Sequence, residues 1–185
     1  MFVTSCSPGP NNIVASYSGF NFGIIKTIPH MCGVIFGFTT LVAIMNFGLV
    51  NIFQRYPIIQ EILKYTGSLF LIYLAYKISF SKSNTEDSSK SPVKFIETFF
   101  FQFINPKSVI VSVIMVSTYV DRGKDFLFYS FWVIGVAFLF ALISINFWTL
   151  VGKFLRRFAT NEKFIKRFNY VMSFLLLICI GTFYL

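Results

Sequence analysis

Charged residues are scarce in this sequence, and acidic residues are the scarcest of them. Only 12% of the 185 residues are charged, with 7 acidic against 16 basic residues, whereas 56% are hydrophobic. A soluble domain carries about 25% charged residues and at most about 50% apolar ones. So little polar surface cannot cover a hydrophobic core in water. The composition therefore excludes an ordinary soluble domain and predicts a membrane protein.

The residues that catalysis and metal binding require are also rare. His30 is the only histidine, and the three cysteines, Cys6, Cys32 and Cys179, lie far apart in apolar runs. The sequence has no HExxH motif, no Ser/His/Asp set, no paired carboxylates in an apolar run and no cofactor motif. We therefore expect neither an enzyme nor a metal or cofactor site.

The net charge of +9 has an explanation in membrane topology. The basic residues lie between long uncharged runs and form no continuous stripe, so we expect no nucleic-acid partner. Lys and Arg accumulate in the cytoplasmic loops of membrane proteins. Here most of them follow the first, third and fifth apolar segments, which predicts that these loops face the cytoplasm. The expected location is the cytoplasmic (inner or plasma) membrane, with several crossings of the lipid bilayer.

Six apolar segments are long enough to cross a bilayer, which takes about 20 helical residues. A polar, serine-rich loop at 81–93 divides a single transmembrane domain, 1–185, into a first repeat, 1–80, and a second repeat, 94–185. Since three crossings is an odd number, the second repeat would be inverted relative to the first. We predict an all-α integral membrane protein with six transmembrane helices in two inverted three-helix repeats. The segments are 1–25, 27–54, 58–80, 95–120, 126–152 and 168–185.

The first helix of each predicted repeat is broken at proline. Proline removes a backbone donor and clashes with a carbonyl one turn earlier, so such breaks persist in a membrane where protein, water or substrate supplies partners. Secondary transporters bind substrate at corresponding breaks of inverted repeats. The two breaks therefore favour a binding site in the middle of the membrane, although a packed proline kink is the alternative. The breaks are Ser7-Pro8-Gly9-Pro10-Asn11-Asn12 and Asn105-Pro106-Lys107.

Lys107 is a cation deep in an apolar segment. Asn105 is suited to cap a restarting helix and Pro106 to occupy its first position. Lys107 then adds its charge to the positive end of the helix dipole, which should attract an anion. It lies about 18 Å along the segment that begins at residue 95, and an intramembrane cation indicates function. The alternative is that Lys107 only binds carbonyl groups freed by the break.

Two asparagines and the histidine are weaker candidates. Asn46 and Asn146 occupy matching places in the second and fifth segments, where we expect interhelical hydrogen bonds and a place along the pathway. His30 follows Pro29 at an expected helix start, which favours a membrane-interface residue over a proton carrier.

Pairs of glycines four residues apart predict close helix packing. Gly19 with Gly23, and Gly33 with Gly37, have the small-xxx-small spacing of membrane helix interfaces. We expect these interfaces within the chain, with a homodimer as the alternative.

Taken together, these motifs resemble the LysE/RhtB family of amino-acid exporters over nearly the whole chain. The resemblance implies a small secondary exporter of amino acids or related molecules, coupled to protons and without a cofactor. Many members carry Asp at the position of Asn11, and an amide cannot release a proton. The matching elements are Pro8-Gly9-Pro10-Asn11, Pro29 to Gly33 with Gly37, Leu63 to Gly67 with Tyr73-Leu74, and Asn105-Pro106-Lys107.

Our leading hypothesis is export by alternating access around a midplane site that binds the carboxylate of an amino acid. A non-transporting structural or assembly subunit of the membrane is the alternative hypothesis. The predicted substrate-binding residues are Pro8, Gly9, Pro10, Asn11, Asn12, Asn46, Asn105, Pro106, Lys107 and Asn146.

Overall fold

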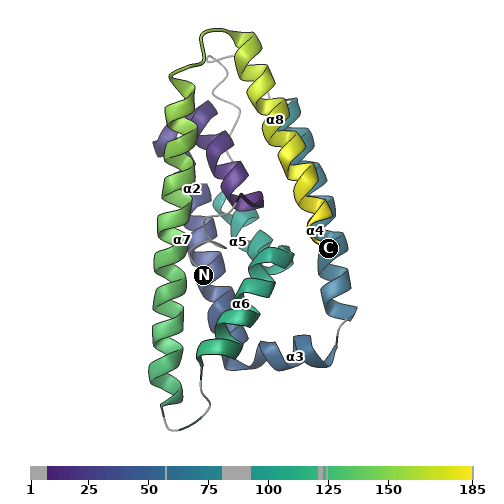
Figure 1. The fold of residues 1–185 in the computed structure, drawn as a ribbon, viewed down its shortest axis with the longest axis vertical. Helices are drawn as coiled ribbons and strands as arrows, with labels where there is room; N and C mark the ends of the chain where they lie inside the picture. The colour runs from purple at the N-terminus through teal and green to yellow at the C-terminus, as the bar shows by residue number, and fades with distance from the viewer. Residues whose placement is uncertain (1–7, 57, 81–92, 121–122, 124, 185) are drawn as a thin grey trace.

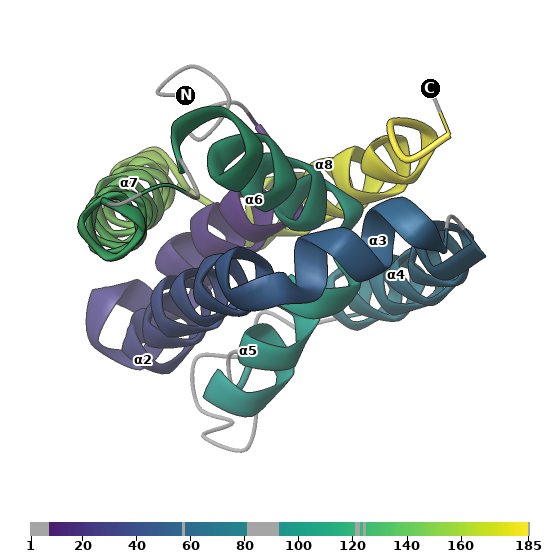
Figure 2. The same ribbon diagram turned by 90° about the horizontal axis from the view of Figure 1, so that it is seen from below.

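A computed structural model describes residues 8–184 except 57, 81–92, 121, 122 and 124. All regular elements of this part are helices, which confirms the all-α prediction. Four helices are long and apolar enough to cross a membrane, and the bent pair α5 and α6 can make a fifth. In both views α7 lies at one side of the molecule and α4 with α8 at the other (Figures 1 and 2). The helices are α2 (Pro10–Ile44), η1 (Met45–Leu49), α3 (Val50–Arg55), α4 (Ile58–Ser79), α5 (Phe95–Ile104), α6 (Pro106–Tyr119), α7 (Phe126–Arg156) and α8 (Glu162–Gly181).

The α2 segment is folded back on itself at Gly23. We call residues 10–22 its first arm and residues 24–44 its second arm. Gly23 has φ 76° and ψ 177°, a conformation that glycine adopts without a steric penalty. Figure 1 shows the first arm running from the middle of the molecule to one end, where the chain turns and the second arm runs back. The predicted packing role of Gly23 is therefore wrong, because a Cβ there would meet nothing within 4 Å.

The second arm ends earlier than the predicted helix 27–54. A π-helical stretch, η1, follows it, and Gly48 within η1 has φ 134°. This positive φ is not a helical conformation, so it interrupts the regular helix. Glycine is the residue that adopts such a φ readily. The chain then continues into the short helix α3, which crosses the end of the molecule (Figure 1). The expectation of one continuous second helix is therefore wrong.

The predicted break at Pro106 is confirmed. Helices α5 and α6 meet at Asn105 and are bent by 63°. The backbone N–H of Asn105 still bonds to the carbonyl of Phe101 (2.8 Å), which closes the last turn of α5. Pro106 lacks an N–H, so it fits the first position of α6, where no intrahelical partner exists.

Glycines let the helices of the two halves approach closely. A Cβ added to Gly33 or Gly37 would lie 2.7 Å from a backbone carbonyl oxygen of α5. Gly152 of α7 meets the backbone carbonyl of Ser16 in the first arm, and Gly19 of that arm meets Thr149. The predicted close packing of Gly19, Gly33 and Gly37 within the chain is thus confirmed. These contacts hold α5 against the second arm and the first arm against α7.

Candidate functional site

Two helix N-termini meet inside the bundle. The first arm begins at Pro10, with Gly9 as its cap in an extended conformation. Helix α6 begins at Pro106, with Asn105 as its cap. The Asn105 side-chain oxygen accepts a hydrogen bond from the backbone N–H of Lys107 (3.1 Å). The two sequence elements that the broken-helix argument singled out therefore lie at one place in the fold.

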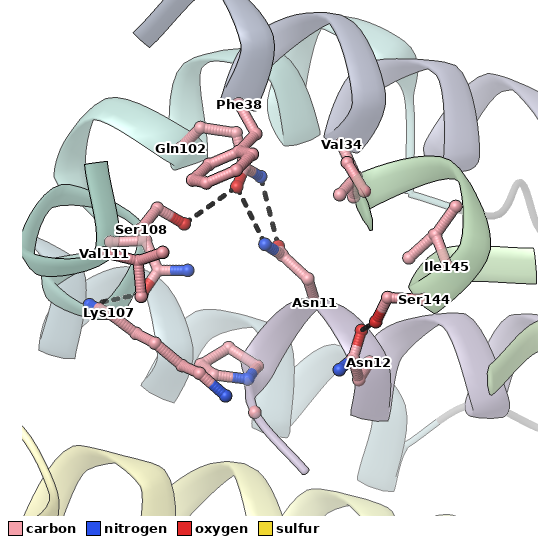
Figure 3. Close-up of a pocket in the computed structure, with 14 residues that line it drawn as sticks. Asn11, Asn12, Val34, Phe38, Gln102, Lys107, Ser108, Val111, Ser144 and Ile145 are labelled. Atoms are coloured by element: carbon pink, nitrogen blue, oxygen red, sulfur yellow. Dashed lines mark hydrogen bonds between the residues drawn. The ribbon is translucent and has the colours of Figure 1, made fainter. Parts of the chain in front are cut away.

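A cavity separates these two helix starts. Its empty space amounts to about 540 Å³ when the open solvent at its mouth is included. Figure 3 shows polar side chains from both halves of the chain pointing toward it. The lining residues are Gly9, Pro10, Asn11, Asn12, Val34, Phe38, Gln102, Asn105, Lys107, Ser108, Val111, Ala141, Ser144 and Ile145.

Lys107 supplies the charge of the cavity, since no acidic residue lines it in the described part of the chain. Its ammonium group reaches the opposite helix start, because a Cβ added to Gly9 would lie 2.8 Å from Lys107 Nζ. The N–H groups at the two helix starts add partial positive charge. The cavity is therefore suited to hold an anionic group such as a carboxylate.

Gln102 lies at the centre of the polar network and was missed by the sequence analysis. It is completely buried. Its Oε1 accepts hydrogen bonds from Asn11 Nδ2 (2.8 Å) and Ser108 Oγ (3.0 Å), and its Nε2 donates to Asn11 Oδ1 (3.1 Å). A glutamine among the phenylalanines of α5, one turn before the predicted break, is the signal that could have found it.

Helix α7 contributes another wall of the cavity. Ser144 Oγ donates to Asn12 Oδ1 at 3.3 Å, which ties α7 to the second residue of the first arm after Pro10 (Figure 3). Apolar side chains complete the lining, among them Val34 and Phe38 from the second arm. The site thus combines one cation, several neutral polar groups and an apolar wall.

His30 is not the interface residue at a helix start that we expected. It lies inside the second arm, because the chain turns at Gly23 and not near Pro29. The ring is buried, with Nδ1 2.9 Å from Thr98 Oγ1 of α5 and Nε2 3.4 Å from the backbone oxygen of Asn11. His30 therefore contacts a residue of the cavity wall from behind.

Four of the predicted site residues do not line this cavity. Pro8 is exposed, and Pro106 is buried behind the wall. Asn46 is buried in η1, where its amide has no hydrogen-bond partner among the described residues. Asn146 donates to Leu142 O of its own helix (2.8 Å). The interhelical hydrogen bonds expected for the two asparagines are thus absent from the described part of the chain.

Comparison with protein families decides what kind of protein carries this site. The sequence model of the LysE type translocator family matches residues 2–185. This chain belongs to that family. The resemblance expected from the sequence motifs is thereby confirmed. Since LysE type translocators are transporters, the expectation that the chain is not an enzyme is confirmed as well.

Curated relatives of this LysE type translocator are named efflux proteins. The "Cysteine/O-acetylserine efflux protein" of Salmonella typhimurium (strain LT2) is 29% identical over 181 residues, covering 96% of this chain and 90% of the relative. The protein of the same name from Escherichia coli (strain K12) is 29% identical over 184 residues, with the same coverage. No solved structure matches the chain.

Proposed function

We propose that this translocator is a secondary active exporter of amino acids or amino-acid-like small molecules across the cytoplasmic membrane. The observation that carries the proposal is the meeting of two helix starts, one from each half, at one cavity with Lys107 between them. Substrates of secondary transporters bind at such junctions. The names of the relatives support cysteine and O-acetylserine as the first substrates to test.

The chemistry of the cavity suits a zwitterion. The substrate carboxylate would bind Lys107 and backbone N–H groups at the start of the first arm, where the Gly9 cap makes no side-chain hydrogen bond. The substrate ammonium would bind an oxygen atom such as Oδ1 of Asn12, with Asn11 beside it facing the rest of the substrate. Both asparagines lie on the first turn of the arm, beside Lys107.

Export would proceed by alternating access between two inverted repeats of three transmembrane helices each. In this scheme α6, which begins at the second cap, corresponds to the first arm, which begins at the first cap. The third helices of the two halves, α4 and α8, pack together, and Ser173 Oγ donates to the backbone oxygen of Ala75 (2.8 Å). Ser68 and Ser173 occupy matching positions of the two halves, and both are buried. Loops after the first, third and fifth helices would face the cytoplasm.

Coupling to protons would use His30. Asn11 cannot release a proton, whereas His30 Nε2 lies 3.4 Å from its backbone oxygen. The Thr98 hydroxyl can accept from a protonated imidazole while it donates to the backbone oxygen of Lys94 (3.1 Å), and it can turn to donate to a neutral imidazole instead. Helices α5, α6 and α7 pack against α2, and the charged side chains on these four helices are Lys26, Glu97, Lys107, Lys153 and Arg156, with Lys94 at the cap of α5.

Proteoliposomes test the transport proposal directly. Purified protein is reconstituted, the vesicles are loaded with radiolabelled cysteine or O-acetylserine, and release is followed with and without an opposing pH gradient. We expect these vesicles to release substrate faster than loaded vesicles without protein, and we expect the gradient to increase the rate further. Release of these and other amino acids at the rate of the protein-free vesicles would contradict the proposal.

A variant of the histidine tests the coupling residue. His30→Gln keeps hydrogen-bonding atoms in the ring's place but removes the titrating group. We expect the variant to release substrate at a rate independent of the pH gradient. A full response to the gradient in His30→Gln would assign proton coupling to another group.

A further inference from the structure

Gln102 uses its entire hydrogen-bonding capacity inside the protein. A side-chain amide offers two N–H donors and two oxygen lone pairs. Gln102 Nε2 donates to Asn11 Oδ1 (3.1 Å) and to the backbone oxygen of Thr98 (2.9 Å). Its Oε1 accepts from Asn11 Nδ2 (2.8 Å) and Ser108 Oγ (3.0 Å). Gln102 therefore has no group left for a substrate, although it lies in the cavity wall.

Its two side-chain partners are not saturated in this way. Among the described residues, Asn11 makes two side-chain hydrogen bonds, both to Gln102, which leaves one N–H and one lone pair on its amide. Ser108 donates its hydroxyl hydrogen to Gln102, which leaves its oxygen as an acceptor. Both residues line the cavity (Figure 3). They present one donor and two acceptors without a formal charge.

The reciprocal amide pair fixes the plane of the Asn11 amide. Two antiparallel hydrogen bonds to Gln102 leave the side chain one orientation, and His30 holds the backbone oxygen of Asn11 from behind. The bond from Gln102 to the Thr98 backbone oxygen anchors the pair to α5. The first arm, α5 and α6 are thus joined by one buried network at the cavity wall. Such support preorganises the groups that contact a ligand.

We propose that Gln102 is a positioning residue for export, which acts through Asn11 and Ser108 and lets them recognise a neutral polar side chain of the substrate. This inference rests on the proposed function. A hydroxyl or thiol on the substrate can both donate and accept, as the two partners require. An apolar substrate side chain would leave the polar groups of Asn11 and Ser108 unpaired. Unpaired polar groups in a buried site lower the affinity for such a substrate strongly.

Serine and alanine are matched substrates for the test, because they differ by one hydroxyl group. The ratio of their release rates from proteoliposomes reports side-chain recognition, while a general loss of structure lowers both rates together. We expect the wild-type protein to release serine faster than alanine. In Gln102→Leu we expect the serine-to-alanine ratio to fall about five- to tenfold, because one or two neutral hydrogen bonds to the substrate are lost. Gln60→Leu, at an exposed position of α4, should leave the ratio unchanged.

A second pair of variants keeps the test decisive if Gln102→Leu does not insert. Gln102→Asn shortens the side chain by one carbon and should also lower the ratio. The double variant Asn11→Gln with Gln102→Asn restores the combined length of the two side chains. It should recover part of the serine-to-alanine ratio. An unchanged ratio in Gln102→Asn, or equal wild-type rates for serine and alanine, would overturn the role of Gln102. Absence of all amino-acid release by the wild type would instead contradict the proposed function.

Discussion

The two helix breaks contribute different chemistry to the same cavity. At the first break the cap is Gly9, and the side chains that follow are the neutral amides of Asn11 and Asn12. At the second break the cap is Asn105, whose side-chain oxygen accepts a hydrogen bond from the backbone N–H of Lys107. The side chain of Lys107 brings the positive charge. The Gly9 cap makes no side-chain hydrogen bond and leaves room for Lys107, whereas Asn105 caps its own helix start. Similar local structure thus provides room in one half and charge in the other.

Among the variants that test the difference between the two breaks, removal of the Lys107 cation should have the largest effect on export. Lys107→Met keeps an unbranched side chain one atom shorter than that of lysine, and it leaves both breaks neutral. We expect export to fall about a hundredfold, because a charge-assisted contact to the substrate carboxylate is lost. Initial release rates from proteoliposomes measure the effect. Lys163→Met, at an exposed lysine of α8, serves as the control and should export normally. Equal rates in the two variants would remove Lys107 from the site.

Filling the space at the first break should have the next largest effect. Gly9 has φ −153°, which any residue adopts, so its role is to leave room for Lys107. We expect Gly9→Val to lower export about tenfold or more. Gly9→Ala should cost only a few-fold, since the contacting atom is the mobile end of a lysine side chain. Concentration dependence of release separates weaker binding from slower turnover. Similar losses in both variants would contradict the steric explanation.

Removal of the cap at the second break should have a moderate effect on export. Asn105 and Asn161 each accept a hydrogen bond from a backbone N–H of the following helix, at 3.1 and 2.8 Å. Each exchange for Ala should lower the free energy of unfolding by about 1 kcal/mol. Thermal unfolding of the detergent-purified variants measures that loss. We expect export to fall about two- to fivefold in Asn105→Ala alone, since Asn161 lies far from the cavity in sequence and on the surface.

The contact between the first break and α7 should matter least. The hydrogen bond from Ser144 to Asn12 is long, at 3.3 Å, and neutral. Ser144→Ala should therefore reduce export by less than about threefold. The same release assay measures it. A loss as large as that of Lys107→Met would show that α7 carries more of the binding than the two breaks do.

Local rules predicted the second break more completely than the first. Asn105 and Pro106 follow cap and first-position preferences, and the bend and the capping hydrogen bond occur as expected. At the first break, Pro10 begins the helix as expected, but the partner of Asn11 is 91 residues away. Gln102 escaped prediction for the same reason, because a lone glutamine in an apolar run has no periodicity or motif that identifies its partner.

The glycines divide in the same way. Gly33 and Gly37 pack as their spacing predicted, since both lie on one face of a continuous helix. Gly19 and Gly23 have the same spacing, yet Gly23 forms a turn. Spacing alone does not separate the two cases, because a glycine in an apolar run serves close packing and a positive φ equally well.

By itself, the amino-acid sequence determined that this protein is helical and resides in a membrane, that helices begin at Pro10 and Pro106, and that Lys107 lies at a helix start. These properties depend on composition and on a few neighbouring residues. Only the tertiary structure decided that the two starts share one cavity, that Gln102 joins them, and that His30 stands behind Asn11. Those relations depend on helices distant in sequence packing through small residues, and no local rule specifies which side chains then meet.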